Sequence, residues 1–139
     1  MRSLHRKFAV AFNLVVFVGP AIAAQPPAGV YACYEARYTQ GAPGCVQSSI
    51  GCFGIAITPS PVMMFGLIDG TNYSDYDGHK GHYQFDQGSG LLTTTDGSLH
   101  GVHYKKVADW SFRKLDDRNK ETSFTCPLDK KKNPLVRPW

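Results

Sequence analysis

Short stretches of alternating apolar and polar residues, separated by turn residues, make up most of the chain after residue 24. The clearest covers residues 82–86, where aromatic and polar side chains alternate with the period of two of a half-buried strand. Glycine, proline and Asp-Gly pairs interrupt the pattern about every ten residues, as they do between short strands. The pattern predicts strands at residues 30–38, 53–58, 62–68, 82–86, 91–95, 102–107, 110–112 and 122–126.

This arrangement predicts an all-β domain. About seven or eight short strands joined by short links favour an antiparallel meander that closes into a barrel or folds into a sandwich. Closure removes exposed strand edges, which would otherwise pair with other chains. Two segments are expected to be loops: residues 39–52, which are rich in glycine, and residues 71–76, which lie between two Asp-Gly turns.

The first 24 residues have the features of a secretory signal peptide. Arg2, Arg6 and Lys7 precede an apolar stretch at residues 8–18, and small residues follow at positions 21–24. The apolar stretch is shorter than the roughly 20 residues of a membrane-spanning helix, so no transmembrane anchor is expected. We expect a periplasmic or secreted protein with one β domain at residues 25–127 and a basic, proline-containing flexible tail at residues 128–139.

Removal of the signal changes the charge balance. The chain has 15 Lys and Arg against 11 Asp and Glu, and three of the basic residues lie in the signal, which leaves 12 against 11. This balance does not favour a nucleic-acid partner. No cofactor is indicated by any motif, and we expect a monomer.

All four cysteines, Cys33, Cys45, Cys52 and Cys126, lie in the part expected to be exported, where thiols oxidise. Two disulfides are therefore expected. Six residues separate Cys45 from Cys52, a span that a local bridge can close, and this leaves Cys33 for Cys126. We prefer this pairing, and the other two connectivities of four cysteines stay open.

Two His-x-x-His pairs are the first candidate for a metal site, and they consist of His79, His82, His100 and His103. Imidazole is a common ligand of zinc and copper. Residues three apart, however, point to opposite faces of a regular strand. Surface histidines beside glycines are therefore the preferred interpretation, and a metal-binding protein or metal-dependent enzyme that uses these four residues is the alternative.

A second candidate site lies in the predicted loop at residues 71–76 and the turn after it. Tyr73 and Tyr76 stand there beside Asp75 and Asp77. Exposed aromatic rings with polar neighbours suit the binding of sugars or protein partners. The same segment begins like a calcium loop, but no glutamate follows at the required distance, so ordinary turn chemistry is preferred.

No catalytic residues are identified. With the four cysteines paired, no thiol nucleophile remains, and no serine lies in a Gly-x-Ser-x-Gly elbow. The sequence favours a non-enzymatic binding module for an envelope or extracellular protein or glycan.

The chain also resembles a group of small exported bacterial all-β domains of unknown function. The resemblance is carried by the start Gly29-x-Tyr31-x-Cys33, by the central pattern Gly78-x-x-Gly81-x-Tyr83-x-x-Asp86, and by the late Cys126. It implies an all-β fold and export, and it implies no substrate, because the shared positions are glycines, aromatic residues and cysteines that direct turns and packing.

Overall fold

The computed structural model describes residues 24–41, 44–48 and 51–139. The predicted signal peptide lies outside these residues except for Ala24. Within the described part the regular structure consists of eleven strands and a short 3-10 helix, Pro61–Met63. The strands are β1 (Gly29–Tyr31), β2 (Tyr34–Gln40), β3 (Val46–Ser48), β4 (Gly51–Pro59), β5 (Phe65–Leu67), β6 (Asn72–Asp75), β7 (Lys80–Asp86), β8 (Leu91–Thr94), β9 (His103–Ala108), β10 (Ser111–Leu115) and β11 (Glu121–Asp129). None of the helical structure in the described residues has the length and apolar composition needed to cross a membrane.

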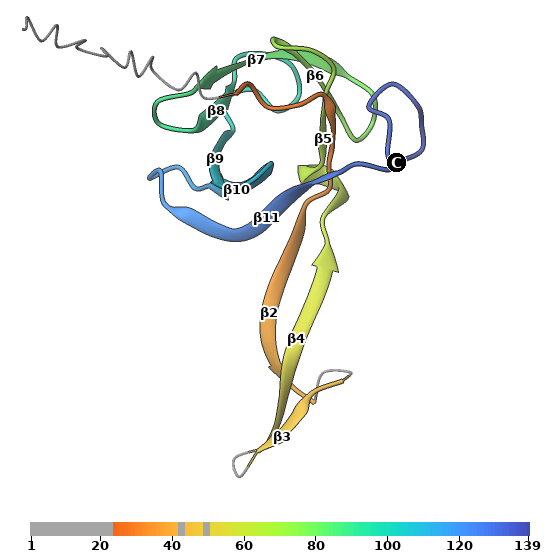
Figure 1. Cartoon of the computed structure of the whole chain (residues 1–139), viewed down its shortest axis with the longest axis vertical. Coiled ribbons are helices and arrows are strands. Elements are labelled where there is room, and N and C mark those ends of the chain that lie inside the picture. The colour runs from red at the N-terminus through yellow and green to blue at the C-terminus, as the bar shows by residue number, and fades with distance from the viewer. Residues whose placement is uncertain (1–23, 42–43, 49–50) are drawn as a thin grey trace, which may run out of the picture.

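Eight of these strands form a closed antiparallel barrel (Figure 1). From β5 to β11 each strand pairs with the next in the chain, and β1 closes the ring by pairing with both β5 and β11. Val30 of β1 lies opposite Gly66 of β5 on one side and Asp129 of β11 on the other. The predicted all-β fold is confirmed, and of its two forms the barrel is the one found.

Aromatic side chains fill the barrel interior. On β7, Gly81 and Tyr83 are buried whereas His82 and Gln84 are exposed, as the period-two pattern predicts. Tyr31 stacks on Phe65 with ring centroids 5.0 Å apart. The largest buried side chains of this core are those of Tyr31, Phe65, Leu67, Tyr73, Tyr83, Leu92, Tyr104 and Phe112.

The hydroxyl groups of the buried tyrosines bind the backbone of the connecting loops. Tyr83 donates to the carbonyl of Asp69 at 2.7 Å, and Tyr73 donates to the carbonyl of Asp96 at 2.8 Å. Burial raises the pKa of Tyr83 to about 12, so its hydroxyl stays a protonated donor at neutral pH. A large aromatic ring can therefore be buried without leaving an unsatisfied polar group.

The chain changes its strand partners at Ala32 and Cys33. The predicted strand at residues 30–38 is divided there, because β1 pairs within the barrel while β2 pairs with β4 along its whole length. β2 touches β11 only at Tyr34 and Glu35. Cys33 is joined to Cys126 of β11, so this disulfide lies where the barrel closes and where β2 leaves it.

β2, β4 and β3 form a three-stranded arm that projects away from the barrel (Figure 1). β2 and β4 are paired from Tyr34–Pro59 to Gln40–Phe53, and β3 pairs with the outer end of β4. The Cys45–Cys52 disulfide lies at this outer end. Both preferred cysteine pairings are confirmed. The segment 39–52, predicted to be a loop, contains β3. The prediction missed this strand because three residues are too few to show an alternating pattern.

Two other segments also differ from the prediction. β5 begins at Phe65 rather than at residue 62, because Pro61 opens a 3-10 turn before it. Residues 71–76, expected to be a loop, contain β6, which is held between β5 and β7. Pairing with the neighbouring strands therefore makes this segment part of the barrel, although the Asp-Gly pairs on both sides of it are typical of turns.

The segment after β11 lies against the barrel beside β5 and β6. The predicted domain boundary at residue 127 falls within β11. A Cβ atom on Gly66 would lie 2.7 Å from the ring of Trp139, so glycine at this position leaves the space that the terminal tryptophan occupies. Arg137 lies 3.6 Å from the centre of the Trp139 ring and donates to the carbonyl of Tyr76 at 2.8 Å.

The two disulfides should differ in their effect on stability because they close loops of different length. Their sequence separations are 93 for Cys33–Cys126 and 7 for Cys45–Cys52. In the chain-entropy model, Cys33→Ala/Cys126→Ala should lower the free energy of unfolding by about 5 kcal/mol, and Cys45→Ala/Cys52→Ala by about 2.5 kcal/mol. Urea unfolding followed by circular dichroism measures both, and equal losses would contradict the prediction.

Candidate functional site

The turn between β6 and β7 and the end of β6 bring together four of the eight candidate residues: Asp75, Tyr76, Asp77 and His79. The backbone N–H of Gly78 donates to the carbonyl of Asp75 at 3.2 Å, and that of Asp75 to the carbonyl of His79 at 2.9 Å. Gly78 has a φ of 95°, a conformation that a residue with a Cβ rarely adopts. The Asp-Gly pair therefore reverses the chain within a few residues and places Asp75, Asp77 and His79 on one turn.

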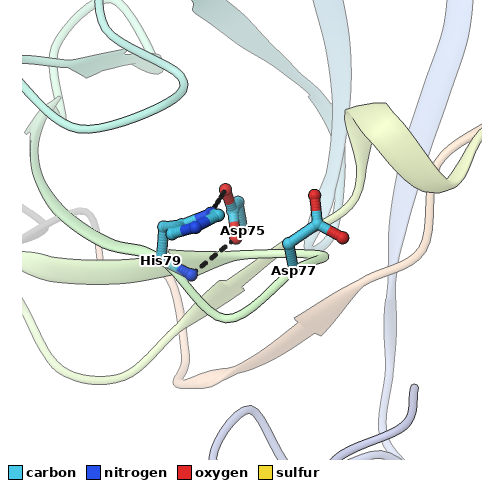
Figure 2. Close-up of side chains that lie close together, drawn as sticks. All are labelled: Asp75, Asp77 and His79. Carbon is cyan, nitrogen blue, oxygen red and sulfur yellow. Dashed lines mark hydrogen bonds and ion pairs between the residues drawn. The ribbon is translucent and has the colours of Figure 1, made fainter.

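Asp75 is the anchor of this turn. Its side chain accepts hydrogen bonds from the backbone N–H of His79 at 2.8 Å and from His79 Nδ1 at 3.0 Å (Figure 2). It also accepts one from the Ser98 hydroxyl. Burial acts to raise the pKa of Asp75, but the hydrogen bonds from Ser98 and His79 outweigh burial and hold the pKa below its ordinary value. The carboxylate is therefore ionised and already has three partners.

In the described residues, the structure brings together a group of side chains that could bind a metal ion: Asp75, Asp77 and His79. Their ligand atoms all lie within 4.8 Å of one another, and Asp77 and His79 are exposed (Figure 2). Two carboxylates and an imidazole are chemically suited to a divalent cation. The guanidinium of Arg137, however, donates to the carbonyls of both Asp75 and Tyr76, so a fixed positive charge lies beside the turn.

The other three candidate histidines lie outside this group. The Nδ1 atom of His82 is 2.7 Å from the Asp96 carboxylate. His100 Nδ1 lies 2.7 Å from the carbonyl of Thr95, and His103 Nδ1 lies 3.0 Å from the Thr93 hydroxyl. The hydrogen bonds from His82 lower the pKa of Asp96, which keeps this carboxylate ionised. Each histidine thus has a separate local partner.

The two tyrosines of the predicted binding site lie in different environments. Tyr76 is 37% exposed at the turn, whereas Tyr73 lies in β6 with its ring fully buried. A Cβ atom on Gly81 or on Gly97 would come within 2.7 Å of the Tyr73 side chain. Glycine at these two positions therefore makes room for Tyr73 in the core, and the surface of this site is formed by Tyr76, Asp77 and His79.

The arm carries a feature that the sequence did not identify as a site. Tyr38 lies directly opposite Ile55, and Ala36 opposite Ile57, so these side chains share one face of the arm. Val46 of β3 lies opposite the position two residues before Ile55 in β4, so strand alternation places Val46 on the same face as Ile55. We call Tyr38, Val46, Ile55 and Ile57 the apolar face of the arm.

This apolar face is open to solvent. The exposed fraction is 84% for Tyr38, 76% for Val46, 54% for Ile55 and 63% for Ile57. The alternation Ile55-x-Ile57 does indicate a strand with one apolar side. What the sequence could not show is that this side faces solvent instead of the core.

The opposite face of the arm is polar. Arg37 and Glu35 form an ion pair of 2.8 Å there, and Thr58 lies opposite Glu35. Hydrogen bonds from Ser123 and Arg37 lower the pKa of Glu35, so it carries its charge at neutral pH. The two faces of the arm therefore differ sharply: one is polar, and the other presents four large uncharged side chains.

No protein-family model, curated protein or solved structure matches this chain.

Replacing Asp75 should weaken the fold and reduce its sensitivity to acid. Asp75→Asn removes the charge that three donors stabilise, which should cost about 1–3 kcal/mol at pH 7. Because the folded-state pKa of Asp75 lies below its ordinary value of 3.8, its contribution is present above that pH and is lost as the pH falls through the folded-state pKa. Urea unfolding at a series of pH values should therefore show a smaller acid-dependent loss in the variant.

Asp77→Asn is the matched control, since it removes the same charge from the exposed part of the same turn. We expect it to change the free energy of unfolding by less than about 0.5 kcal/mol. Equal effects of the two substitutions would show that the hydrogen bonds to Asp75 contribute nothing specific.

Proposed function

We propose that this chain is an exported, non-enzymatic binding module and that its arm presents the contact surface to a protein partner. The observation that carries the proposal is the exposed apolar face formed by Tyr38, Val46, Ile55 and Ile57. Contiguous exposed apolar surface is uncommon on proteins that act alone and is typical of interaction sites. The signal-like residues 1–24 and the two disulfides support export.

The arm suits a protein partner better than it suits a glycan. Sugar recognition requires hydrogen-bonding groups beside aromatic rings, whereas the apolar face combines one tyrosine with three aliphatic side chains. A sheet with one apolar face normally buries it against a second layer of structure. In the described part of the chain that face lies open, so a partner protein would supply the missing layer.

The arrangement around Asp75 supports a structural role for this corner rather than an enzymatic one. Ser98 donates to Asp75, and His79 bonds to the same carboxylate. A serine nucleophile is activated by a histidine that accepts its proton, and here the serine hydroxyl is directed to the carboxylate. The barrel interior is filled by aromatic side chains, so the small-ligand cavity of wider barrels is occupied by the core.

A single charge on the apolar face should strongly weaken partner binding. Immobilised wild-type protein and the variant Ile55→Lys would be exposed to a bacterial envelope fraction and the retained proteins compared by mass spectrometry. A lysine there would lose its hydration on binding, so we expect retention to fall by about tenfold or more. Thr58→Lys places the same charge on the polar face and should retain the same proteins; equal losses in both variants would contradict the proposal.

The metal-binding alternative has a separate test. Under the proposed function, native mass spectrometry with and without a chelator should give the same mass for the protein. A stoichiometric metal that is lost from His82→Ala/His103→Ala would instead support the alternative based on all four histidines. A metal lost only from Asp77→Asn or His79→Ala would assign it to the turn between β6 and β7.

A further inference from the structure

We propose that the apolar face of the arm binds a second copy of this chain, with the two arms packed face to face about a two-fold axis. The inference rests on the proposed function, because it names the partner of the same surface. It also differs from the sequence analysis, which expected a monomer. Nothing in the sequence indicates that the apolar side of β4 lies outside the barrel.

The charge distribution on the arm is the first argument. The apolar face contains no charged residue, and the charges of Glu35 and Arg37 lie on the opposite face, where they pair with each other at 2.8 Å. A charged partner would find no complement on this face. Two identical uncharged faces meet without like-charge repulsion, and a two-fold axis brings the same patch of each copy together.

The strand edges of the arm are the second argument, because they distinguish a protein partner from a lipid bilayer. Among the described residues, the part of β2 beyond Glu35 is paired on one side, with β4. The backbone groups on the other side of β2 can bind water when the arm packs against another protein face to face. Inside hydrocarbon the same groups would lose their hydrogen bonds, which costs several kcal/mol for each group.

The position of the arm is the third argument. The arm extends away from the barrel (Figure 1), and two arms packed in opposite directions would place their barrels at opposite ends. The Cys45–Cys52 disulfide holds β3 to the outer end of β4. Less conformational freedom is then lost when the arm is covered, which favours association.

The size of the face sets the strength of the dimer. β2 and β4 are paired over seven residues and β3 pairs with three residues of β4. With strands about 4.8 Å apart, this gives a face of a few hundred Å² on each copy. A stable interface buries about 800 Å² on each partner. The arms alone should therefore form a reversible dimer that depends on protein concentration rather than a permanent one.

Sedimentation velocity of the full chain, purified with both disulfides intact, tests this inference. Between about 1 µM and about 1 mM, the weight-average mass should rise from one copy towards two. Ile55→Lys should remain a single copy over the whole range, whereas Thr58→Lys should associate as the wild type does. Circular dichroism of each variant checks that the fold is retained, and the milder Ile57→Thr, which should weaken association about tenfold, serves if the lysine variant does not fold.

Three results would overturn the inference. The first is a wild-type protein that stays a single copy at every concentration, and the second is association that Ile55→Lys leaves unchanged. The third is cosedimentation of the wild type, but not of Ile55→Lys, with phosphatidylcholine vesicles, which would make a bilayer the occupant.

The proposed function can survive failure of this inference. A protein that remains a single copy and still loses its envelope partners through Ile55→Lys would have a different protein as its partner. If neither self-association nor partner capture depends on Ile55, both proposals are wrong.

Discussion

The bond between Cys33 and Cys126 joins the two parts of this molecule. Cys33 lies between β1, which closes the barrel, and β2, which begins the arm, and Cys126 lies in β11, the strand that both of them contact. Three backbone paths therefore meet at one covalent bond. The arm can extend into solvent because its base is held at this point to a closed barrel, and the barrel keeps its first strand in place through the same bond.

The barrel depends on aromatic side chains that serve two purposes. The rings of Tyr73 and Tyr83 fill the interior, while their hydroxyls bind the carbonyls of Asp96 and Asp69 in the connecting loops. Packing and loop conformation are thus coupled, because a ring cannot move without breaking the loop contact. The turn that carries Asp75 and His79 is linked to this arrangement, since Tyr73 lies two residues before Asp75 on β6, and Ser98, which donates to Asp75, lies in the loop that Tyr73 binds.

The turn at Asp75 lies on the barrel, between β6 and β7, whereas the apolar face lies on the arm. The turn at Asp75 uses its polar groups on one another and on Arg137, so its geometry is explained by the stability of the fold. The apolar face of the arm has no such explanation, because Tyr38 and Val46 are more than three-quarters exposed. Exposure of these apolar side chains does not stabilise a monomer, whereas an interaction surface explains it.

By itself, the sequence determined the class of fold and the approximate positions of most strands, and it favoured the cysteine pairing that the structure confirms. Period-two alternation and turn residues are local properties, so segments such as 82–86 and 91–95 could be assigned without knowing their neighbours. Only the tertiary structure decided which apolar sides face inward. Tyr73 entered the core through the pairing of β6 with β5 and β7, whereas Ile55 and Ile57 were left outside because β4 pairs with β2 and β3 beyond the barrel. Alternation shows that a strand has an apolar side, but the strands that pair with it determine whether that side is buried.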